Sequence, residues 1–408
     1  MKNNKLMFLL FLTVFIDVIG FGIIIPLLPF YAEHFGASPA IITLLFSCYS
    51  LMQFLFAPFW GSLSDRVGRR PILLLSIGGS CLSYLWCGLA TSLWMLFASR
   101  LLAGFMGGTI VTAQAYVSDI TTPENRTKGM GMIGASLGLG FTLGPAIGGF
   151  LAGSSLEQVN YQLPLLAASG LSFCGFIFAF FSLPKSEKIH SNQKIKPVSI
   201  SQKFLGLFTT LQLPLVNVLI GIFFLSVLGL LGAQTTLALW LERQFSWGPQ
   251  QTGYVLMFCG VVATILQGGM IGILSRQFGE INLLVSGICL LGMGLFLVPF
   301  STSLVLLLSA MFLLTIGECL SKTTIRSLLS QLVETNETGK ILGIAQSGGS
   351  LAAIIGPSLG GLAFVSMGKD YPFFNGAILM LISIILCLSV IKKIRLEISD
   401  RSKVNQVG

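Results

Sequence analysis

Long apolar runs make up most of this chain, and this feature restricts its fold more than any other. Of its 408 residues, 54% are hydrophobic and 10% are charged, whereas soluble domains carry roughly 25% charged residues. About 20 helical residues cross a hydrocarbon core, and lipid accepts only backbones whose polar groups are bonded internally. The runs therefore predict an all-α integral membrane protein. Its twelve expected helices lie near residues 5–30, 40–60, 71–90, 93–118, 129–153, 162–183, 212–238, 250–271, 281–300, 303–330, 340–366 and 372–392.

A duplicated motif divides these runs into two halves. The segment 144–149 (GPAIGG) reappears as 356–361 (GPSLGG), about 212 residues later, and 61–68 aligns with 272–279 at an offset of 211. Repeated membrane halves are typical of transporters whose two bundles move around a central site. The expected parts are a first six-helix bundle at 1–183, a cytoplasmic linker at 184–211, and a second six-helix bundle with a short cytoplasmic tail at 212–408.

The basic residues follow the topology that these helices define. The net charge is +9, and in a twelve-span arrangement nearly all Lys and Arg residues between helices fall on one side, leaving Arg243 and Lys369 on the other. This asymmetry is the positive-inside rule, and it predicts a multi-pass protein of the cell (inner) membrane with both termini in the cytoplasm. It explains the basic charge without nucleic acid as a partner. The first apolar run is too long for a signal peptide and contains Asp17, so we expect it to remain as a helix.

The cysteines and histidines indicate neither a metal site nor a cofactor. The eight cysteines are scattered through apolar runs, and none forms a C-x-x-C pair. The segment 134–138 (GASLG) matches a hydrolase motif, but it lies within an expected membrane helix, and His34 and His190 lie in loops. We therefore do not expect an enzyme. Because the sequence has no phosphate-binding loop, an ion gradient must supply the energy.

Four motifs follow one another along the first half. They are Asp17-x-x-Gly20-x-Gly22, Gly61-x-Leu63-Ser64-Asp65-Arg66-x-Gly68-Arg69-Arg70, Arg100-x-x-x-Gly104-x-x-Gly107-Gly108 and Gly140-x-x-x-Gly144-Pro145-x-x-Gly148-Gly149. On these motifs the chain resembles the major facilitator superfamily, and within it the twelve-helix drug:proton antiporter branch of tetracycline-type and multidrug exporters. The resemblance covers essentially the whole chain and implies two six-helix bundles that work as a monomer.

The loop after the helix expected at 40–60 resembles a cytoplasmic latch. The resemblance implies that Asp65 and Arg69 pair with Asp119, at the inner end of the helix expected at 93–118. The second half carries Arg276 where Asp65 stands, so we expect the latch to be one-sided. The remaining residues of the latch motif are Gly61, Arg66, Gly68 and Arg70.

Glycines at four-residue spacing lie on one helix face and let a neighbouring backbone approach closely. A proline among them removes a backbone donor and loosens the helix. Close packing alone would explain this pattern, and the resemblance adds that such helices seal the route between the cytoplasm and the outside. The residues of this helix-packing gate are Gly140, Gly144, Pro145, Gly148, Gly149, Gly356, Pro357, Gly360 and Gly361.

Charged residues within the spans need a reason, because each costs about 2.5–3.5 kcal/mol at the helix centre. Asp17 is predicted to carry the coupled proton, as the resemblance also implies, since apolar surroundings favour a neutral carboxyl group. The alternative is a structural Asp bonded to backbone or to a buried cation. Arg100 keeps its proton, and we expect it near Asp17, where it would bias proton release.

Glu318 and Lys322 form an i,i+4 pair. This pair either holds its helix in place or lines the cavity, with Glu318 as a second proton site or a contact for a cationic substrate.

Polar side chains within spans usually face the protein interior rather than lipid. The expected substrate cavity is lined by Gln53, Tyr84, Gln114, Gln234, Trp240, Tyr254, Glu318, Lys322 and Gln346. A wide apolar pocket with few polar groups suits lipophilic cations. Ser83 stands where tetracycline exporters carry an acid before a tyrosine, which argues against tetracycline as the substrate.

These features predict a secondary active transporter that exports small lipophilic or cationic compounds in exchange for protons by alternating access. Its partners would be a small-molecule substrate, protons and membrane lipid. Two alternatives stay open, namely an importer or facilitator of a nutrient, working as a proton symporter, and an exporter of an endogenous metabolite such as a siderophore. The Gly144-Pro145 pattern and Asp17 argue against import.

Overall fold

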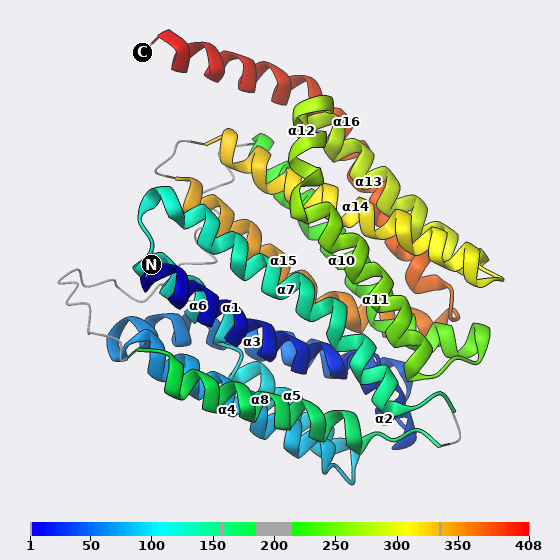
Figure 1. Cartoon of the computed structure of the whole chain (residues 1–408). Coiled ribbons are helices and arrows are strands. Elements are labelled where there is room, and N and C mark those ends of the chain that lie inside the picture. The colour runs from blue at the N-terminus through cyan, green and yellow to red at the C-terminus, as the bar shows by residue number, and fades with distance from the viewer. Residues whose placement is uncertain (1, 156–157, 185–213, 334–336, 408) are drawn as a thin grey trace. The chain divides into compact units, whose positions relative to one another are not determined.

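The computed structural model describes residues 2–155, 158–184, 214–333 and 337–407. Within these ranges every regular element is a helix (Figure 1), and twelve helical segments are long and apolar enough to cross a membrane. The expected all-α integral membrane fold is therefore confirmed. The expected linker at 184–211 lies outside the described residues, apart from Pro184.

The chain divides into two compact units. Unit 1 comprises Met1–Pro197 with Leu237–Thr264, and unit 2 comprises Val198–Thr236 with Ile265–Gly408. The boundaries of the two predicted six-helix bundles stay a prediction. Unit 1 takes in a segment of the second half, because the helix that starts at Pro249 packs closely on a helix of the first half, as described below.

In unit 1 the first helix occupies a central place. It packs against α7 and α8, while α4 packs against α5 and α8. The helices of unit 1 are α1 (Lys2–Ile24), α2 (Leu28–His34), α3 (Pro39–Val67), α4 (Arg69–Gly88), α5 (Leu93–Phe105), α6 (Thr109–Ile120), α7 (Pro123–Ala152), α8 (Gln162–Ser182) and most of α11 (Pro249–Ile265).

The interior of unit 1 and its surface are both apolar. Leu10 and Val14 of α1, Leu73 of α4 and Ala113 of α6 are completely buried and belong to one cluster. On the outside, large apolar side chains are exposed, and Phe181 reaches 80% exposure. A water-facing surface would not tolerate many such side chains, whereas lipid does. Because lipid is as apolar as these side chains, close van der Waals packing must hold the helices together.

Two expected spans are interrupted in unit 1. The first helix ends at Ile24 and the chain restarts as α2 at Leu28, because Pro26 cannot donate a backbone hydrogen bond. The span expected at 93–118 is broken between α5 and α6 at residues 106–108. A side chain at Gly108 would come within 3.0 Å of Trp60 Cβ, so glycine permits the break to pack against α3.

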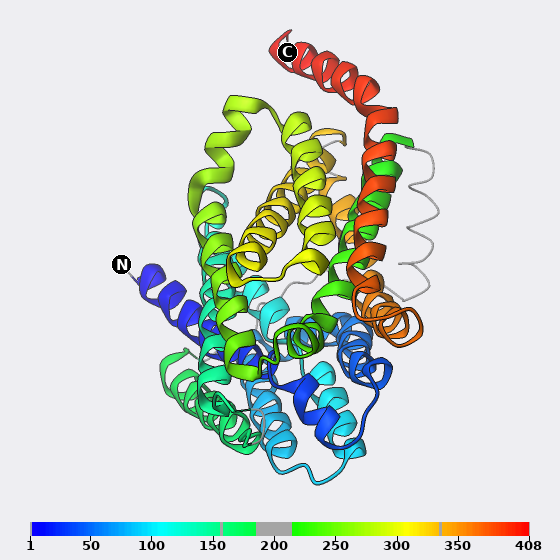
Figure 2. The same ribbon diagram turned by 90° about the vertical axis from the view of Figure 1, so that its right-hand side faces the viewer.

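Unit 2 is organised around α13. Figures 1 and 2 show α13 beside α14, and α13 also packs against α16. The π-helical segment η2 contains Gly269, whose φ of 150° interrupts the eighth span. The elements of unit 2 are α10 (Pro214–Phe245) up to Thr236, η2 (Leu266–Met270), α12 (Ile271–Phe278), α13 (Glu280–Leu297), η3 (Val298–Phe300), α14 (Leu304–Gln331), α15 (Thr338–Ser366) and α16 (Tyr371–Val407).

Candidate functional site

Asp17 lies in the apolar part of α1, within the membrane span Leu6–Ile24. Its Oδ1 atom is shielded from solvent and has no hydrogen-bond partner. The hydroxyl-bearing residues Ser80 of α4 and Thr109 of α6 lie beside the carboxyl group. The carboxyl group of Asp17 therefore has polar neighbours from α4 and α6 within an apolar membrane span.

Arg100 shares these surroundings. The side chain is 2% exposed, and its Nε and Nη2 atoms are buried without hydrogen-bond partners. Tyr49 of α3 and Tyr84 of α4 both lie within electrostatic range of Asp17 and of Arg100. No ion pair joins Asp17 and Arg100 in the part of the chain that the structure describes. We call Asp17, Tyr49, Ser80, Tyr84, Arg100 and Thr109 the polar cluster.

Small residues allow this polar cluster to assemble. A Cβ atom at Gly20 would lie 2.8 Å from Cε2 of Tyr84, so the missing side chain makes room for the tyrosine ring beside α1. At Gly104 a Cβ atom would lie 2.8 Å from Cβ of Met52, which brings α5 close to α3. Within α3, Gln53 Nε2 donates a hydrogen bond to the hydroxyl of Tyr49 over 3.3 Å.

Ser83 takes no part in the polar cluster. It is completely buried, and its hydroxyl donates to the backbone oxygen of Ser99 over 2.8 Å. The position at which tetracycline exporters were expected to carry an acid is thus a packing contact between α4 and α5 in this chain.

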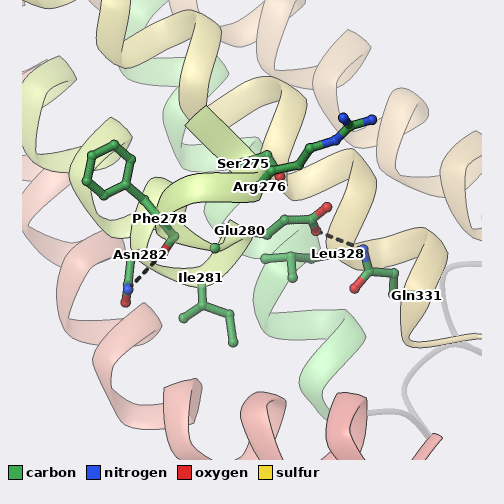
Figure 3. A pocket seen from close by; sticks show the side chains of 9 residues that line it. Ser275, Arg276, Phe278, Glu280, Ile281, Asn282, Leu328 and Gln331 are labelled. Atoms are coloured by element: carbon green, nitrogen blue, oxygen red, sulfur yellow. Dashed lines mark hydrogen bonds between the residues drawn. The ribbon is translucent and has the colours of Figure 1, made fainter. Parts of the chain in front are cut away.

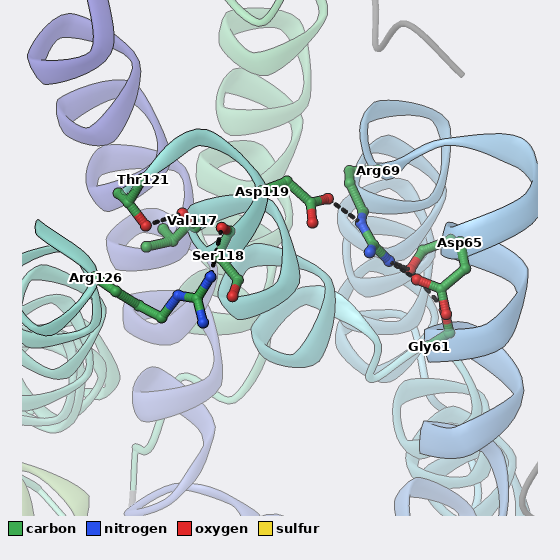
Figure 4. Close-up of polar contacts among 9 residues, drawn as sticks. Gly61, Asp65, Arg69, Val117, Ser118, Asp119, Thr121 and Arg126 are labelled. Carbon is green, nitrogen blue, oxygen red and sulfur yellow. Dashed lines mark hydrogen bonds and ion pairs between the residues drawn. The ribbon is translucent and has the colours of Figure 1, made fainter. Parts of the chain in front are cut away.

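At the end of α3, three charged residues of the expected latch lie together (Figure 4). Arg69 Nη1 is 2.5 Å from Asp65 Oδ1, and Arg69 Nε is 2.7 Å from Asp119 Oδ2. Ser64, which belongs to the motif but not to the expected latch residues, accepts a further hydrogen bond from Arg69 over 2.7 Å. The guanidinium group therefore connects α3, α4 and α6, as the latch motif predicts.

The other residues of the latch motif do different things. Gly68 has a φ of 107° and ends α3, since its N–H bonds to Ser64 O over 3.1 Å. Gly61 O accepts the hydroxyl of Ser64 over 2.7 Å. Arg70 points to α8, where it donates to Phe180 O and lies over the Phe180 ring. Arg66 is exposed.

The second half carries a hydrogen-bonded contact at the matching position, while the one-sided latch stays a prediction. Glu280 stands 211 residues after Arg69. Its Oε1 accepts from Ser327 over 2.7 Å. Its Oε2 accepts from Gln331 over 2.9 Å, and Figure 3 shows this second contact. Glu280 and Gln331 line a cavity of about 550 Å³ together with Arg276. The sequence comparison missed it because the central cation of the first half is replaced by an anion.

In unit 1 the glycines of the predicted gate face two neighbouring helices. Cβ atoms at Gly140, Gly144 and Gly148 would come within 2.7–2.8 Å of Val18 Cγ1, Gly22 Cα and Ile23 Cα of α1. On another side of α7, a Cβ atom at Gly149 would lie 2.6 Å from Pro249 O of α11. Pro145 is buried, and its backbone oxygen lies against Gly253 of α11. Helix α7 is thus held between α1 and α11.

Unit 2 repeats the first of these contacts. A Cβ atom at Gly360 of α15 would lie 2.8 Å from Gly232 Cα of α10, and one at Gly356 would lie 2.9 Å from Leu228 O. Pro357 and Gly361 are buried. The close approach of α15 to α10 corresponds to that of α7 to α1.

The residues predicted to line the substrate cavity fall into two groups. Gln114, Gln234, Tyr254, Lys322 and Gln346 are exposed within their units, and Gln53 and Glu318 are partly exposed. Tyr84 and Trp240 are buried, at 3% and 0% exposure. Tyr84 belongs to the polar cluster, and Trp240 packs edge to face on Phe245. These two predictions therefore need correction, because the aromatic rings fill interior space.

Sequence reasoning missed several polar residues near the site. Tyr49 lies four residues before Gln53 on α3, a spacing that would have placed both on one face. Thr109 and Ser80 carry no signal of their own, since hydroxyls occur throughout the spans. In unit 2, Arg326 of α14 continues the i,i+4 series of Glu318 and Lys322, as the sequence spacing predicts.

An aromatic group formed by α2 and the residue before α8 in unit 1 also went unpredicted. Tyr31 and Tyr161 stack with ring centroids 4.9 Å apart, and His34 lies beside Tyr161. Burial, with smaller contributions from Cys87 and Tyr161, raises the pKa of Tyr31 to about 12. Its hydroxyl therefore keeps its proton and donates to Ala90 O over 2.7 Å. This contact ties α2 to the end of α4.

The helical fold, the twelve spans and the charged groups within them define a multi-pass membrane transporter rather than an enzyme. The chain belongs to the Major Facilitator Superfamily, which it matches over residues 10–346 and 268–405. Tetracycline resistance protein class G of Vibrio anguillarum is 33% identical over 399 residues, covering 94% of this chain and 96% of the relative. Multidrug resistance protein 2 of Bacillus subtilis (strain 168) is 27% identical over 389 residues, covering 94% of each chain.

A solved structure supports the same fold. The crystal structure of a POT family transporter in complex with 5-aminolevulinic acid superimposes with a TM-score of 0.76 at 15% identity, covering 95% of this chain and 96% of that one. At this identity the match concerns the fold alone. The resemblance to the major facilitator superfamily inferred from four motifs is thus confirmed.

Proposed function

We propose that the protein exports small lipophilic or cationic compounds across the inner membrane in exchange for protons, by alternating access. Relatives named for resistance to tetracycline and to multiple drugs support export as the direction. The distribution of basic residues supports a cytoplasmic location of both termini. The chain is proposed to act as a monomer.

The observation that carries the proposal is the buried, unpartnered Oδ1 atom of Asp17. An ionised carboxylate inside a membrane span costs about 2.5–3.5 kcal/mol on insertion scales, so binding a proton relieves that cost. Arg100 lies in the same polar cluster and cannot give up its charge. A conformational change that moves water or Arg100 toward Asp17 would favour the carboxylate and release the proton. Proton loading and release would in this way be tied to the two states of the transporter.

Residues Asp65, Arg69 and Asp119 are proposed to act as a cytoplasmic latch. Their contacts join the inner ends of three helices. Movement of α6 relative to α3 and α4 would have to break the contact between Arg69 and Asp119. The glycines of α7 and α15 are proposed to serve as the helix-packing gate, since they permit close helix contacts in each half.

Proton movement in inside-out vesicles with an acidic lumen tests the proposal. Tetracycline, lipophilic cations and candidate metabolites are added one at a time while a fluorescent dye reports the pH gradient. A substrate should collapse the gradient in the wild type and leave it intact in Asp17→Asn. The matched control is Asp370→Asn, which makes the same change in an acid outside the membrane spans.

Two results would contradict the proposal. Collapse of the gradient that persists in Asp17→Asn at equal expression would remove this residue as the proton carrier. A gradient that no compound affects, combined with substrate uptake into whole cells, would favour an importer or facilitator.

A further inference from the structure

Three charged side chains occupy successive turns of α14 in unit 2. Glu318, Lys322 and Arg326 are spaced by four residues and therefore share one face of the helix. Glu318 lies at the middle of α14, which runs from Leu304 to Gln331. Lys322 Nζ is 3.5 Å from Glu318 Oε1, and the two side chains remain 46% and 28% exposed. This pair is therefore accessible within unit 2.

Arg326 contacts two neutral side chains. Its Nη2 atom donates to Gln346 Oε1 of α15 over 3.0 Å, and its guanidinium carbon lies 5.9 Å from the centre of the Phe223 ring of α10. Among the residues that the structure describes, no carboxylate forms an ion pair with Arg326. The face thus carries two cations and one carboxylate, and the carboxylate is already paired with Lys322.

This imbalance is unusual inside a membrane span. Exposed charges at this depth face a water-filled cavity rather than lipid, because lipid would not solvate them. Cations one helical turn apart also repel each other. An anionic group placed between Lys322 and Arg326 would remove the repulsion and balance the charge. Arginine presents a planar fork of donors that matches a carboxylate, which makes it suited to this task.

We propose that Lys322 and Arg326 bind an acidic group of the transported compound, so that the substrates are amphipathic carboxylates, including zwitterions. This inference rests on the proposed export function and narrows its substrate class, excluding compounds whose only charge is positive. Gln346 holds the guanidinium group in place through its hydrogen bond, and Phe223 offers an apolar contact. Glu318 is one turn beyond Lys322, and in the complex it pairs with the basic group of a zwitterion in place of Lys322.

Binding of three compounds with one aromatic ring system tests the inference. They are 2-naphthoate, which is an anion, 2-naphthylalanine, which is a zwitterion, and 2-naphthylmethylammonium, which is a cation. Calorimetric titration of the purified full-length protein should show tighter binding of the two carboxylates than of the cation. Arg326→Gln and Lys322→Gln should each weaken carboxylate binding about tenfold, which corresponds to about 1.4 kcal/mol.

Matched variants separate a binding role from a structural one. Arg326→Lys keeps the charge and should retain more carboxylate affinity than Arg326→Gln. Lys340→Gln removes an exposed cation at the start of α15, away from this face, and should leave the affinity unchanged. Glu318→Gln should weaken binding of 2-naphthylalanine more than that of 2-naphthoate. If Arg326→Gln does not fold, Lys322→Gln and Arg326→Lys carry the comparison.

The outcomes distinguish this inference from the export proposal. Preference for the cation, no binding of any of the three compounds, or unchanged carboxylate affinity in both Gln variants would overturn the inference. Proton movement driven by cations alone in the vesicle assay would leave export standing and would also overturn it. Carboxylate binding that depends on Arg326, without any proton movement, would support the anion site while the export proposal fails.

Discussion

At the scale of single residues, Arg69 shows how one cation can organise several helix ends. The side chain is 14% exposed and contacts carboxylates of α3 and α6. Loss of this group would leave Asp119, which is 23% exposed, without the ion pair that it makes with Arg69. Partly buried charged groups depend more on such contacts than groups at a free surface do.

We predict that Arg69→Gln lowers stability by about 1.5–3 kcal/mol, the usual range for a hydrogen bond to a charged group. The effect should be non-additive with Asp119→Asn, because both substitutions remove the same contact. Thermal unfolding of the two single variants and the double variant in detergent checks this. Arg66→Gln, at an exposed position of the same motif, is the control and should change little. Strictly additive losses would show that Arg69 and Asp119 do not interact.

How much of the site was predictable also differs from residue to residue. Asp17 was accessible from the sequence, because a charge in an apolar run stands out, and the family resemblance implied the pairing of Arg69 with Asp119. Tyr49 and Thr109 were not, because their contribution depends on which helices meet, and spacing along one helix does not report that. Trp240 was predicted to line the substrate cavity, because an aromatic ring with a polar atom fits a cavity wall and a packed interior equally well.

At the scale of helices, glycine determines which elements approach each other. In unit 1 the small face of α7 brings its backbone against Gly22 and Ile23 of α1. The sequence predicted this face from four-residue spacing, but it could not say which helices the glycines meet. It also placed most spans correctly and missed the break between α5 and α6, since glycines at 107 and 108 fit a packed helix as well as a broken one.

Gly144→Val should therefore destabilise the protein. A Cβ atom at this position would lie 2.7 Å from Gly22 Cα, and backbone cannot move aside as a flexible side chain can. Overpacking of this kind costs typically 1–3 kcal/mol. Gly134→Val on the same helix is the control, because nothing lies within 4 Å of a Cβ atom there. Thermal unfolding in detergent should separate the two variants, and equal midpoints would contradict the packing seen at Gly144.

At the scale of the whole molecule, the two halves have kept their helix packing and changed their polar chemistry. Gly360 meets Gly232 as Gly144 meets Gly22. By contrast, Arg69 with its acidic partners corresponds to Glu280 with Ser327 and Gln331. Packing tolerates few replacements, because any side chain would collide with backbone. A polar contact can replace its cation by an anion and still join two helix ends. A repeat in the sequence therefore reveals the glycine packing better than it reveals the polar contact.

The distribution of basic residues also predicts the orientation of the whole chain in the membrane. With both termini in the cytoplasm, Asn125 in the first turn of α7 faces the cytoplasm, and Thr302 between η3 and α14 faces outward. Both residues are exposed. In a cysteine-free background, Thr302→Cys should react with a membrane-impermeant maleimide in intact cells, and Asn125→Cys should react only in inside-out vesicles. Both should react after permeabilisation, which controls for accessibility. The reverse pattern would invert the orientation, place the Lys- and Arg-rich loops outside, and remove the topological support for export.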